Sequence, residues 1–541
     1  LLFAGSETGM IDLNEKKIVS KGRLGPGEIL GVRIEKGKVY SNDEIKNYLS
    51  KEYKHYNNQI IDLDKKLEAE TEKVELEGQS LRNFQHCFGY SIEDLELILH
   101  PMAEDAKEAT GSMGDDTPLA VLSDKYRPLY HYFRQNFSQV TNPPIDSLRE
   151  NKVMSLKTRF GNLGNILDFS KLTKDNIYVL NSPILSNAQF EKFLKFFGNN
   201  NKVLDCTFSK DDDLETSINL LKVKSEQAVR EGIKQIILSD KNISENRMPM
   251  PMLLCIGAIN THLVKLGLRG YVSINVQTGD ALDTHSFATL IGVGATTVNP
   301  YLAFDSLYQR HSKKLFGNFT FDECVSRYIK SVNLGLLKIM SKMGISVLSS
   351  YRGGCNFETV GLSRTIVKDY FPGMLSKISG IGLKGIEKKI RTIHKEAFFN
   401  NSNILPIGGI YRYRKNGETH QYQGKLIHLL QTAVGQGSYE IYKKYIKGIY
   451  NLNPISLRDL VDFKSKNPID ISNVEPASNI LKRFGSGSMS HGALSKEAHE
   501  TLAVGMNRIK GASCSGEGGE DEKRFKIMEN GDSANSRVKQ I

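Results

Sequence analysis

Residues 484–521, FGSGSMSHGALSKEAHETLAVGMNRIKGASCSGEGGED, combine a loop rich in glycine and serine, an amphipathic segment and a second loop rich in glycine and acid. The amphipathic segment predicts a helix, because its apolar and small residues recur at steps of three and four. Ser495 occupies the position of an N-cap, and Glu497 falls in the first turn, where the helix dipole favours an anion. The apolar stripe of this helix is predicted to consist of Leu494, Ala498, Leu502, Gly505, Met506 and Ile509.

The two loops have the composition of a site for an anionic ligand. Glycines such as Gly487 lack a β-carbon, so backbone N–H groups can approach a ligand closely, and the neighbouring serines add hydroxyl donors. The second loop, residues 513–521, is polar and is expected to turn sharply at its glycines. Glycine-rich turns are also common in plain connections, so composition alone leaves a binding loop and a flexible loop as open alternatives.

Several blocks of the sequence resemble the glutamate synthase family. The block GSMSHGALSKEAHETLAVGMNRI, followed by SGEGGED, is similar to the opening of the FMN-binding domain of that family. Three further blocks are similar to parts of the family's central domain: EATGSMGDDTPLAVLSDKYRPLYHYFRQNFSQVTNPPIDSLRE (108–150), GDALDTHSFATLIGVGATTVNPYLAFD (279–305) and SYRGGCNFETVGLS (350–363). KGRLGPGEILGV (21–32) resembles the last strands of the amidotransferase domain. These blocks follow the family's order along nearly the whole chain.

The resemblance implies a division of the chain into three parts. Residues 1–60 are expected to form the tail of a glutamine amidotransferase domain and a connector, residues 61–380 the central domain, and residues 381–541 the beginning of the FMN-binding domain. The implied fold class is α/β, with a parallel sheet in the central domain and the start of a (β/α)8 barrel after it. Because the chain starts with Leu1 and stops within RVKQI, we expect it to be a piece of a longer protein.

The resemblance also implies the residues of a flavin site. The residues expected against the FMN or its substrate are Gly487, Ser488, Met489, Ser490, Ser515, Gly516, Glu517 and Gln540. Glu497 is expected at the mouth of the site, where its carboxylate could pass a proton to or from ammonia. His491 and Cys514 depart from the family pattern, which has an apolar residue and an asparagine there. No residue of the chain is expected to bind a metal.

The chemistry implied by the resemblance joins two active sites. Glutamine is hydrolysed in the amidotransferase domain, and ammonia travels through a tunnel to 2-oxoglutarate, which becomes an imino acid that reduced FMN converts to glutamate. Electrons come from an NAD(P)H-oxidising small subunit or from ferredoxin through a 3Fe-4S cluster whose ligands lie outside this chain. The central domain is expected to be a scaffold. The alternatives are a non-catalytic scaffold or interaction fragment, and another FMN barrel oxidoreductase.

Composition agrees with an enzyme of several domains in the cytoplasm. The chain has 541 residues, 39% of them hydrophobic, which suffices for two or three cores. No apolar run approaches the roughly 20 residues of a membrane span, and no leader opens the chain. The net charge of +11 is spread along the sequence without a nucleic-acid-binding motif, so we expect neither nucleic acid nor membrane as a partner.

The cysteines and histidines give no separate active site. The six cysteines contain no C-x-x-C pair, which disfavours a metal or disulfide framework. Cys355 is not expected to act as a nucleophile, because no histidine and acid accompany it locally. His262 and His285 are interpreted as packed or surface histidines.

A strand and helix alternation runs from residue 177 to 349 and predicts parallel strands joined by crossover helices, ending in a strand at ISVLSS (345–350). Residues 43–77 are predicted to be a solvated helical connector. Asp115 and Asp116 are interpreted as caps of a helix that follows, rather than as metal ligands. Residues 408–424 are predicted to form a segment like a β-hairpin, followed by helices.

Overall fold

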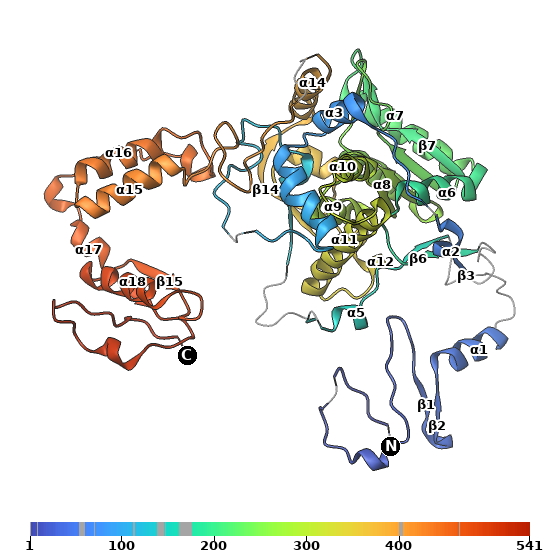
Figure 1. Ribbon diagram of the computed structural model, residues 1–541, viewed down its shortest axis with the longest axis horizontal. Coiled ribbons are helices and arrows are strands. Elements are labelled where there is room, and N and C mark those ends of the chain that lie inside the picture. The colour runs from blue at the N-terminus through green and yellow to red at the C-terminus, as the bar shows by residue number, and fades with distance from the viewer. Residues whose placement is uncertain are drawn as a thin grey trace. The chain divides into compact units, whose positions relative to one another are not determined.

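The computed structural model describes residues 2–7, 9–52, 60–69, 71–111, 114–137, 145–146, 148–161, 176–399, 404–464 and 466–540. The chain divides into two compact units, which are described separately (Figure 1). The first unit spans Leu1–Leu460 and the second spans Val461–Ile541.

A four-stranded parallel sheet lies at the centre of the first unit. Its strands are β7 (Asn201–Asp205), β9 (Gln235–Ser239), β11 (Ser273–Gln277) and β12 (Thr297–Asn299), in the order β12-β11-β9-β7. Each neighbouring pair is parallel. The connections contain the helices α7 (Leu214–Arg230), α8 (Met252–Lys265) and α9 (Thr284–Val293). The predicted parallel strands with crossover helices are therefore confirmed for this stretch.

Burial explains why these strands read as continuous apolar runs. All five residues of β9 are buried, as expected for a parallel strand with both faces covered. α8 is apolar on most of its circumference because it packs against α7, α9 and α13 (Arg364–Tyr370). The core continues into α10 (Tyr301–Ser312) and α11 (Phe321–Met343), and Figure 1 shows these two helices beside α8 and α9. Among the described residues, no helix is both long and apolar enough to span a membrane.

Two smaller mixed sheets flank the central one in sequence. β6 (Ile177–Leu180) pairs in parallel with β3 (Ile60–Asp62) and antiparallel with β5 (Thr158–Phe160), so it does not begin the central sheet. β13 (Phe357–Leu362) pairs in parallel with β14 (Leu375–Ile381) and antiparallel with β4 (Phe133–Gln135). Residues 43–77 were predicted to be a helical connector. They include helix α2 (Leu63–Leu67) and most of α1 (Asn42–Glu52), but β3 is a strand, so the prediction is wrong there.

Two further predictions are wrong in detail. The predicted strand ISVLSS is a single bridge from Val347 to Ser155 followed by the short helix α12 (Leu348–Tyr351). No helix follows Pro118 in the described residues 114–128. Instead Asp115 Oδ1 accepts the N–H of Thr117 at 3.0 Å in a turn, and Asp116 Oδ1 lies 2.9 Å from Nδ1 of His420.

Residues 404–423 form turns and bends rather than the predicted hairpin, because side chains from other segments make hydrogen bonds with their backbone N–H groups. The Glu93 carboxylate accepts the N–H groups of Ile410 and Arg412 at 2.6 and 2.9 Å. Glu418, 3% exposed, accepts the Ser123 hydroxyl at 2.6 Å. The predicted helices after this segment are confirmed as α15 (Gly424–Gln436) and α16 (Tyr439–Tyr450).

Several further helices and strands belong to the first unit. Near its start, β1 (Gly31–Arg33) and β2 (Lys38–Tyr40) pair antiparallel. Residues 78–104 contain α3 (Gly78–Cys87), a π-helical turn (Asp94–Leu99) and α4 (His100–Glu104). Helix α6 (Asn187–Phe197) follows β6 within the predicted alternation, whereas α14 (Leu383–Phe399) lies beyond its predicted end at residue 349.

The second unit contains one parallel strand pair. β15 (Gly485–Ser488) and β16 (Ala512–Cys514) lie side by side, and α18 (Lys496–Arg508) forms the crossover between them. The short helix α17 (Ala477–Leu481) precedes β15. This strand–helix–strand arrangement contains the two glycine-rich loops of residues 484–521.

Removing a core side chain of α8 should destabilise the first unit. Leu253 is 0% exposed, whereas Val264 on the same helix is 57% exposed. We expect Leu253→Ala to lower the free energy of unfolding by about 2–5 kcal/mol, since the cavity is only partly filled. Val264→Ala should change it by about 0.5 kcal/mol or less. Urea unfolding followed by circular dichroism measures both, and equal effects would contradict the burial described for α8.

Candidate functional site

The ends of the parallel pair bring two loops together. Because β15 and β16 run in the same direction, both carboxyl ends lie at one edge, and Ser488 is paired with Cys514 there. The loop after β15 (489–495) and the loop after β16 (515–521) therefore start side by side. Ligands of open α/β sheets bind at this edge.

Glycines allow the two loops to touch. Gly516 has a φ of +67°, and a β-carbon there would lie 2.8 Å from the carbonyl carbon of Met489. A β-carbon on Gly518 would lie 2.6 Å from the hydroxyl oxygen of Ser490. In contrast, a β-carbon on Gly487 would have no atom within 4 Å, so a ligand can approach this backbone closely.

A third segment closes the side of the site next to β16. Ser515 donates its N–H to the Val538 carbonyl at 3.0 Å, and Val538 donates to the Ser513 carbonyl at 2.9 Å. Gln540 then accepts the hydroxyl of Ser488 and donates to the Glu517 carboxylate at 3.4 Å. The structure thus gathers, in one place, all of the residues that the sequence assigned to a cofactor: Gly487, Ser488, Met489, Ser490, Ser515, Gly516, Glu517 and Gln540.

Helix α18 begins where the sequence places its cap. Ser495 Oγ accepts the N–H of Ala498 at 3.3 Å. The exposed Glu497 accepts from its own backbone N–H and from Ser495, and these hydrogen bonds hold the pKa of its carboxyl below the usual value. Glu497 is therefore ionised at neutral pH. It lines a surface groove of about 650 Å³ together with Leu502 and Met506.

The predicted apolar stripe of α18 is not its buried face. The buried residues of the helix are His499 and Ala503. Of the predicted stripe, Ala498, Gly505 and Ile509 are exposed, and the others are half-buried: Leu494, Leu502 and Met506. The polar His499 is buried because its ring makes two hydrogen bonds, to Met489 and to Arg524.

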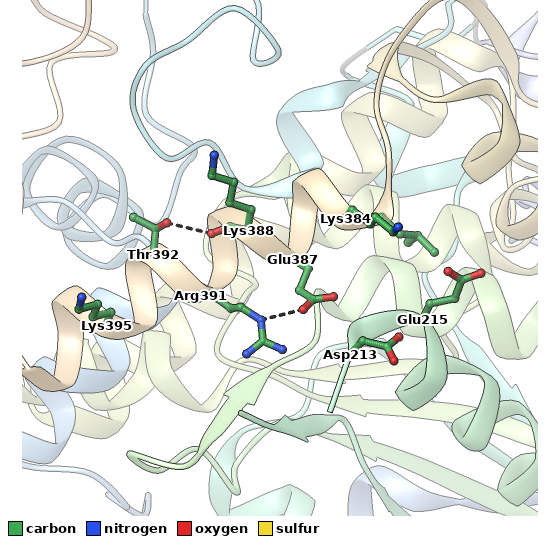
Figure 2. Close-up of a pocket in the computed structure, with 9 residues that line it drawn as sticks. Asp213, Glu215, Lys384, Glu387, Lys388, Arg391, Thr392 and Lys395 are labelled. Carbon is green, nitrogen blue, oxygen red and sulfur yellow. Dashed lines mark hydrogen bonds and ion pairs between the residues drawn. The ribbon is translucent and has the colours of Figure 1, made fainter. Parts of the chain in front are cut away.

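A second groove, of about 530 Å³, lies between α14 and the start of α7 (Figure 2). Lys384, Lys388 and Lys395 lie along its α14 side. Glu387 accepts the Leu214 N–H at 3.0 Å and pairs with Arg391 at 2.7 Å. These contacts attach α14 to α7, so we interpret the groove as a helix junction.

Two acids, the buried Asp240 and the half-buried Asp280, lie at the carboxyl edge of the central sheet. Asp240 accepts from the Thr278 hydroxyl, the Tyr301 hydroxyl and the Gly279 N–H, and burial raises its pKa to about 7. Burial likewise raises the pKa of Asp280 to about 6. Because the oxygens of Asp240 accept from three neighbouring groups, this carboxyl fixes loops at the sheet edge.

The other sequence candidates have structural roles. His262 Nε2 lies 2.9 Å from the Glu226 carboxylate, and His285 Nε2 lies 3.0 Å from the Tyr130 carbonyl. Burial raises the pKa of the Cys355 thiol, which disfavours the thiolate that a nucleophile needs. Within the described part of the chain, no group of three or more His, Cys, Asp or Glu side chains is placed to hold a metal ion.

Family models match three segments of the chain. Residues 83–363, more than half of the chain, match the glutamate synthase central domain, and residues 420–541 match a conserved region in glutamate synthase. The chain belongs to the glutamate synthase family. Residues 1–58 match the class-II glutamine amidotransferases.

Curated glutamate synthases align with the whole chain. The NADPH glutamate synthase large chain of Azospirillum brasilense is 49% identical over 550 residues, and that of Bacillus subtilis is 40% identical over 547. Ferredoxin-dependent glutamate synthase 2 of Arabidopsis thaliana is 38% identical over 577 residues. Each alignment covers 100% of this chain but only 35–36% of the relative, so the chain spans about a third of their length.

Solved structures are only distantly similar. The flavin-binding domain of baker's yeast flavocytochrome b2 has 12% identity and a TM-score of 0.21, covering 38% of this chain and 47% of that domain. A score this low does not establish a common fold.

The contact between the two loops predicts a specific effect of a single methyl group. Gly516→Ala would push a β-carbon into the Met489 backbone, whereas Gly519→Ala, at a similar φ of +72°, meets no atom within 4 Å. Both variants carry the strain of a positive φ, about 1–2 kcal/mol, but only the first adds overpacking. We expect Gly516→Ala to speed hydrogen exchange at residues 486–491 far more than Gly519→Ala does. Equal exchange in the two variants would contradict the loop contact.

Proposed function

We propose that this chain is the part of a glutamate synthase that joins the amidotransferase domain to the FMN site and supplies the first loops of that site. The complete protein would make L-glutamate from L-glutamine and 2-oxoglutarate. The observation that carries the proposal is the meeting of two glycine-rich loops and Gln540 at the carboxyl edge of a parallel pair, in a chain of this family.

The residues of the site fit the requirements of FMN. The flavin ring and phosphate need hydrogen-bond donors and a backbone that a flat ring can approach, and Gly487, Ser490 and Gln540 offer both. Bound there, FMN would supply the hydride that reduces the imino acid formed from 2-oxoglutarate and ammonia. Met489 and Gly516 would hold the two loops at a fixed separation, and Ser515 and Glu517 would face the flavin and substrate.

The arrangement of the chain supports the proposed domains. We assign residues 1–60 to the amidotransferase tail and connector, 61–380 to the central domain and 381–541 to the beginning of the FMN-binding domain. The strand–helix–strand unit β15–α18–β16 has the parallel connection that repeats in a (β/α)8 barrel. The central parallel sheet is consistent with a scaffold, because the Asp240 carboxylate at its edge accepts hydrogen bonds from the side chains of Thr278 and Tyr301.

The electron donor would be an NAD(P)H-oxidising subunit or ferredoxin, acting through a 3Fe-4S cluster held by the longer protein. Relatives of both kinds align with the whole chain. A non-catalytic scaffold or another FMN barrel oxidoreductase would not make glutamate from glutamine and 2-oxoglutarate, so an assay for that product separates these alternatives from the proposal.

The proposed proton carrier is Glu497. We expect Glu497→Gln in the full-length protein to lower glutamate formation on the order of a hundredfold, the usual scale of general acid–base catalysis. FMN content and glutaminase activity should persist, since neither requires this carboxylate.

Glu500→Gln is the matched control, because Glu500 lies on the same helix and pairs only weakly with Lys496, at 3.9 Å. This variant should keep the wild-type rate of glutamate formation. If the two variants have the same rate, Glu497 is a surface acid at a helix N-terminus and its assigned role is wrong.

Residues 1–541 alone should form no glutamate. The chain spans about a third of the length of its curated relatives, so most of the protein that would carry the reaction lies outside it. Glutamate production from glutamine and 2-oxoglutarate by the purified chain, measured with added FMN and reductant, would refute this.

A further inference from the structure

A buried ion cluster lies behind the glycine loop. The side chains of Arg524 and Glu520 are 2% and 1% exposed, and Arg524 Nη2 lies 3.1 Å from Glu520 Oε1. The other carboxylate oxygen of Glu520 pairs with Lys539 at 2.6 Å, and Ser536 donates its N–H to Oε1 at 3.0 Å. Buried charges are costly unless they are paired, so these contacts fix the geometry of the cluster.

The cluster determines which ring nitrogen of His499 carries the proton. Arg524 Nη1 lies 2.7 Å from Nδ1 of His499. A guanidinium group has only donors, so Nδ1 must accept and the ring proton must sit on Nε2. His499 Nε2 then donates to the Met489 carbonyl at 2.9 Å. The remaining donors of Arg524, Nε and Nη2, are held by the Ala534 carbonyl at 2.9 and 2.7 Å.

The carbonyl of Met489 is the point where the cluster reaches the loops. On one side it accepts from His499, and on the other it faces Gly516, where an added β-carbon would lie 2.9 Å from this oxygen. The orientation of this peptide therefore sets how residues 487–490 pack on the second loop. Neither contact requires the side chain of Met489.

The same cluster also holds the third segment of the site. Glu520 binds Ser536 and Lys539, which lie in the segment that ends in Gln540. Gln540 in turn accepts the Ser488 hydroxyl. One buried pair, Arg524 and Glu520, therefore holds both sides of the candidate site.

We propose that His499 is a positioning residue of the flavin site: Arg524 keeps its proton on Nε2, and this N–H holds the Met489 carbonyl so that the glycine loop has one arrangement before the cofactor binds. The inference rests on the proposed function, because it concerns the loop assigned to FMN. Positioning should act through affinity for FMN and through the motion of the loop, since His499 itself is buried behind it.

Two substitutions separate the two hydrogen bonds of the ring. In His499→Asn, the side-chain oxygen can replace Nδ1 as acceptor for Arg524, but the shorter side chain does not reach the Met489 carbonyl. In His499→Gln, the amide nitrogen can replace Nε2 as the donor to that carbonyl. The variants are therefore matched in polarity and differ in the bond that the inference depends on.

The measurements use the full-length protein. The dissociation constant of FMN is obtained from quenching of flavin fluorescence, and hydrogen exchange of residues 486–491 is followed without FMN. We expect His499→Asn to weaken FMN binding about 3- to 10-fold and to speed exchange of the loop, consistent with the loss of one hydrogen bond. His499→Gln should remain within about twofold of the wild type on the same scale.

The outcomes distinguish the inference from the proposed function. Equal FMN affinity and equal loop exchange in the wild type and folded His499→Asn would overturn the positioning role. Equal impairment of both variants would also overturn it, since the ring would then matter for packing alone, as in its stacking on His491 at 5.7 Å. If the wild type binds no FMN, the proposed function fails, while faster loop exchange in His499→Asn alone still supports the positioning role.

A folding defect does not remove the test. If His499→Asn does not yield folded protein, His499→Gln decides: wild-type loop exchange and affinity support the inference, and loss of either in the folded variant contradicts it.

Discussion

Two parallel strands cannot be joined by a tight turn, and much of this structure depends on that constraint. Each parallel neighbour in the central sheet is reached through a helix, and the same holds for β15 and β16 in the second unit. The carboxyl ends of the strands consequently meet at one edge. In the central sheet that edge is occupied by the buried Asp240 network, whereas in the second unit it carries two open glycine loops.

Buried ionic side chains hold the segments that lack strands. Glu93 holds the turns at residues 410–412, and Glu418, a few residues further on, accepts from the distant Ser123 hydroxyl. In the second unit, Arg524 and Glu520 have the corresponding role for the loop after β15 and the segment before Gln540. A buried carboxylate that accepts several N–H groups can replace the ladder of a sheet, which explains why segments without regular structure keep a defined path.

The sequence predicted the periodic parts of the structure and missed contacts between distant polar residues. Strands such as β9 and helices such as α7 were predictable, because burial imposes a repeat that can be read along the chain. The strand predicted at ISVLSS is wrong, because a short apolar run does not distinguish a strand from a buried helical turn. The glycine loops and the Ser495 cap have local signatures. The contact of His499 with Arg524 has no local signature in the sequence, because the two residues are 25 positions apart.

We propose that the loops after β15 and β16 form one wall of an FMN site, and an experimental structure of the full-length protein with FMN would test this. Flavin density should lie against Gly487–Ser490 and Ser515–Glu517, with the Gln540 side chain within hydrogen-bonding distance of the ring. Flavin bound at full occupancy elsewhere in the protein, with these loops in contact only with solvent or protein, would show that the loops are not part of the FMN site.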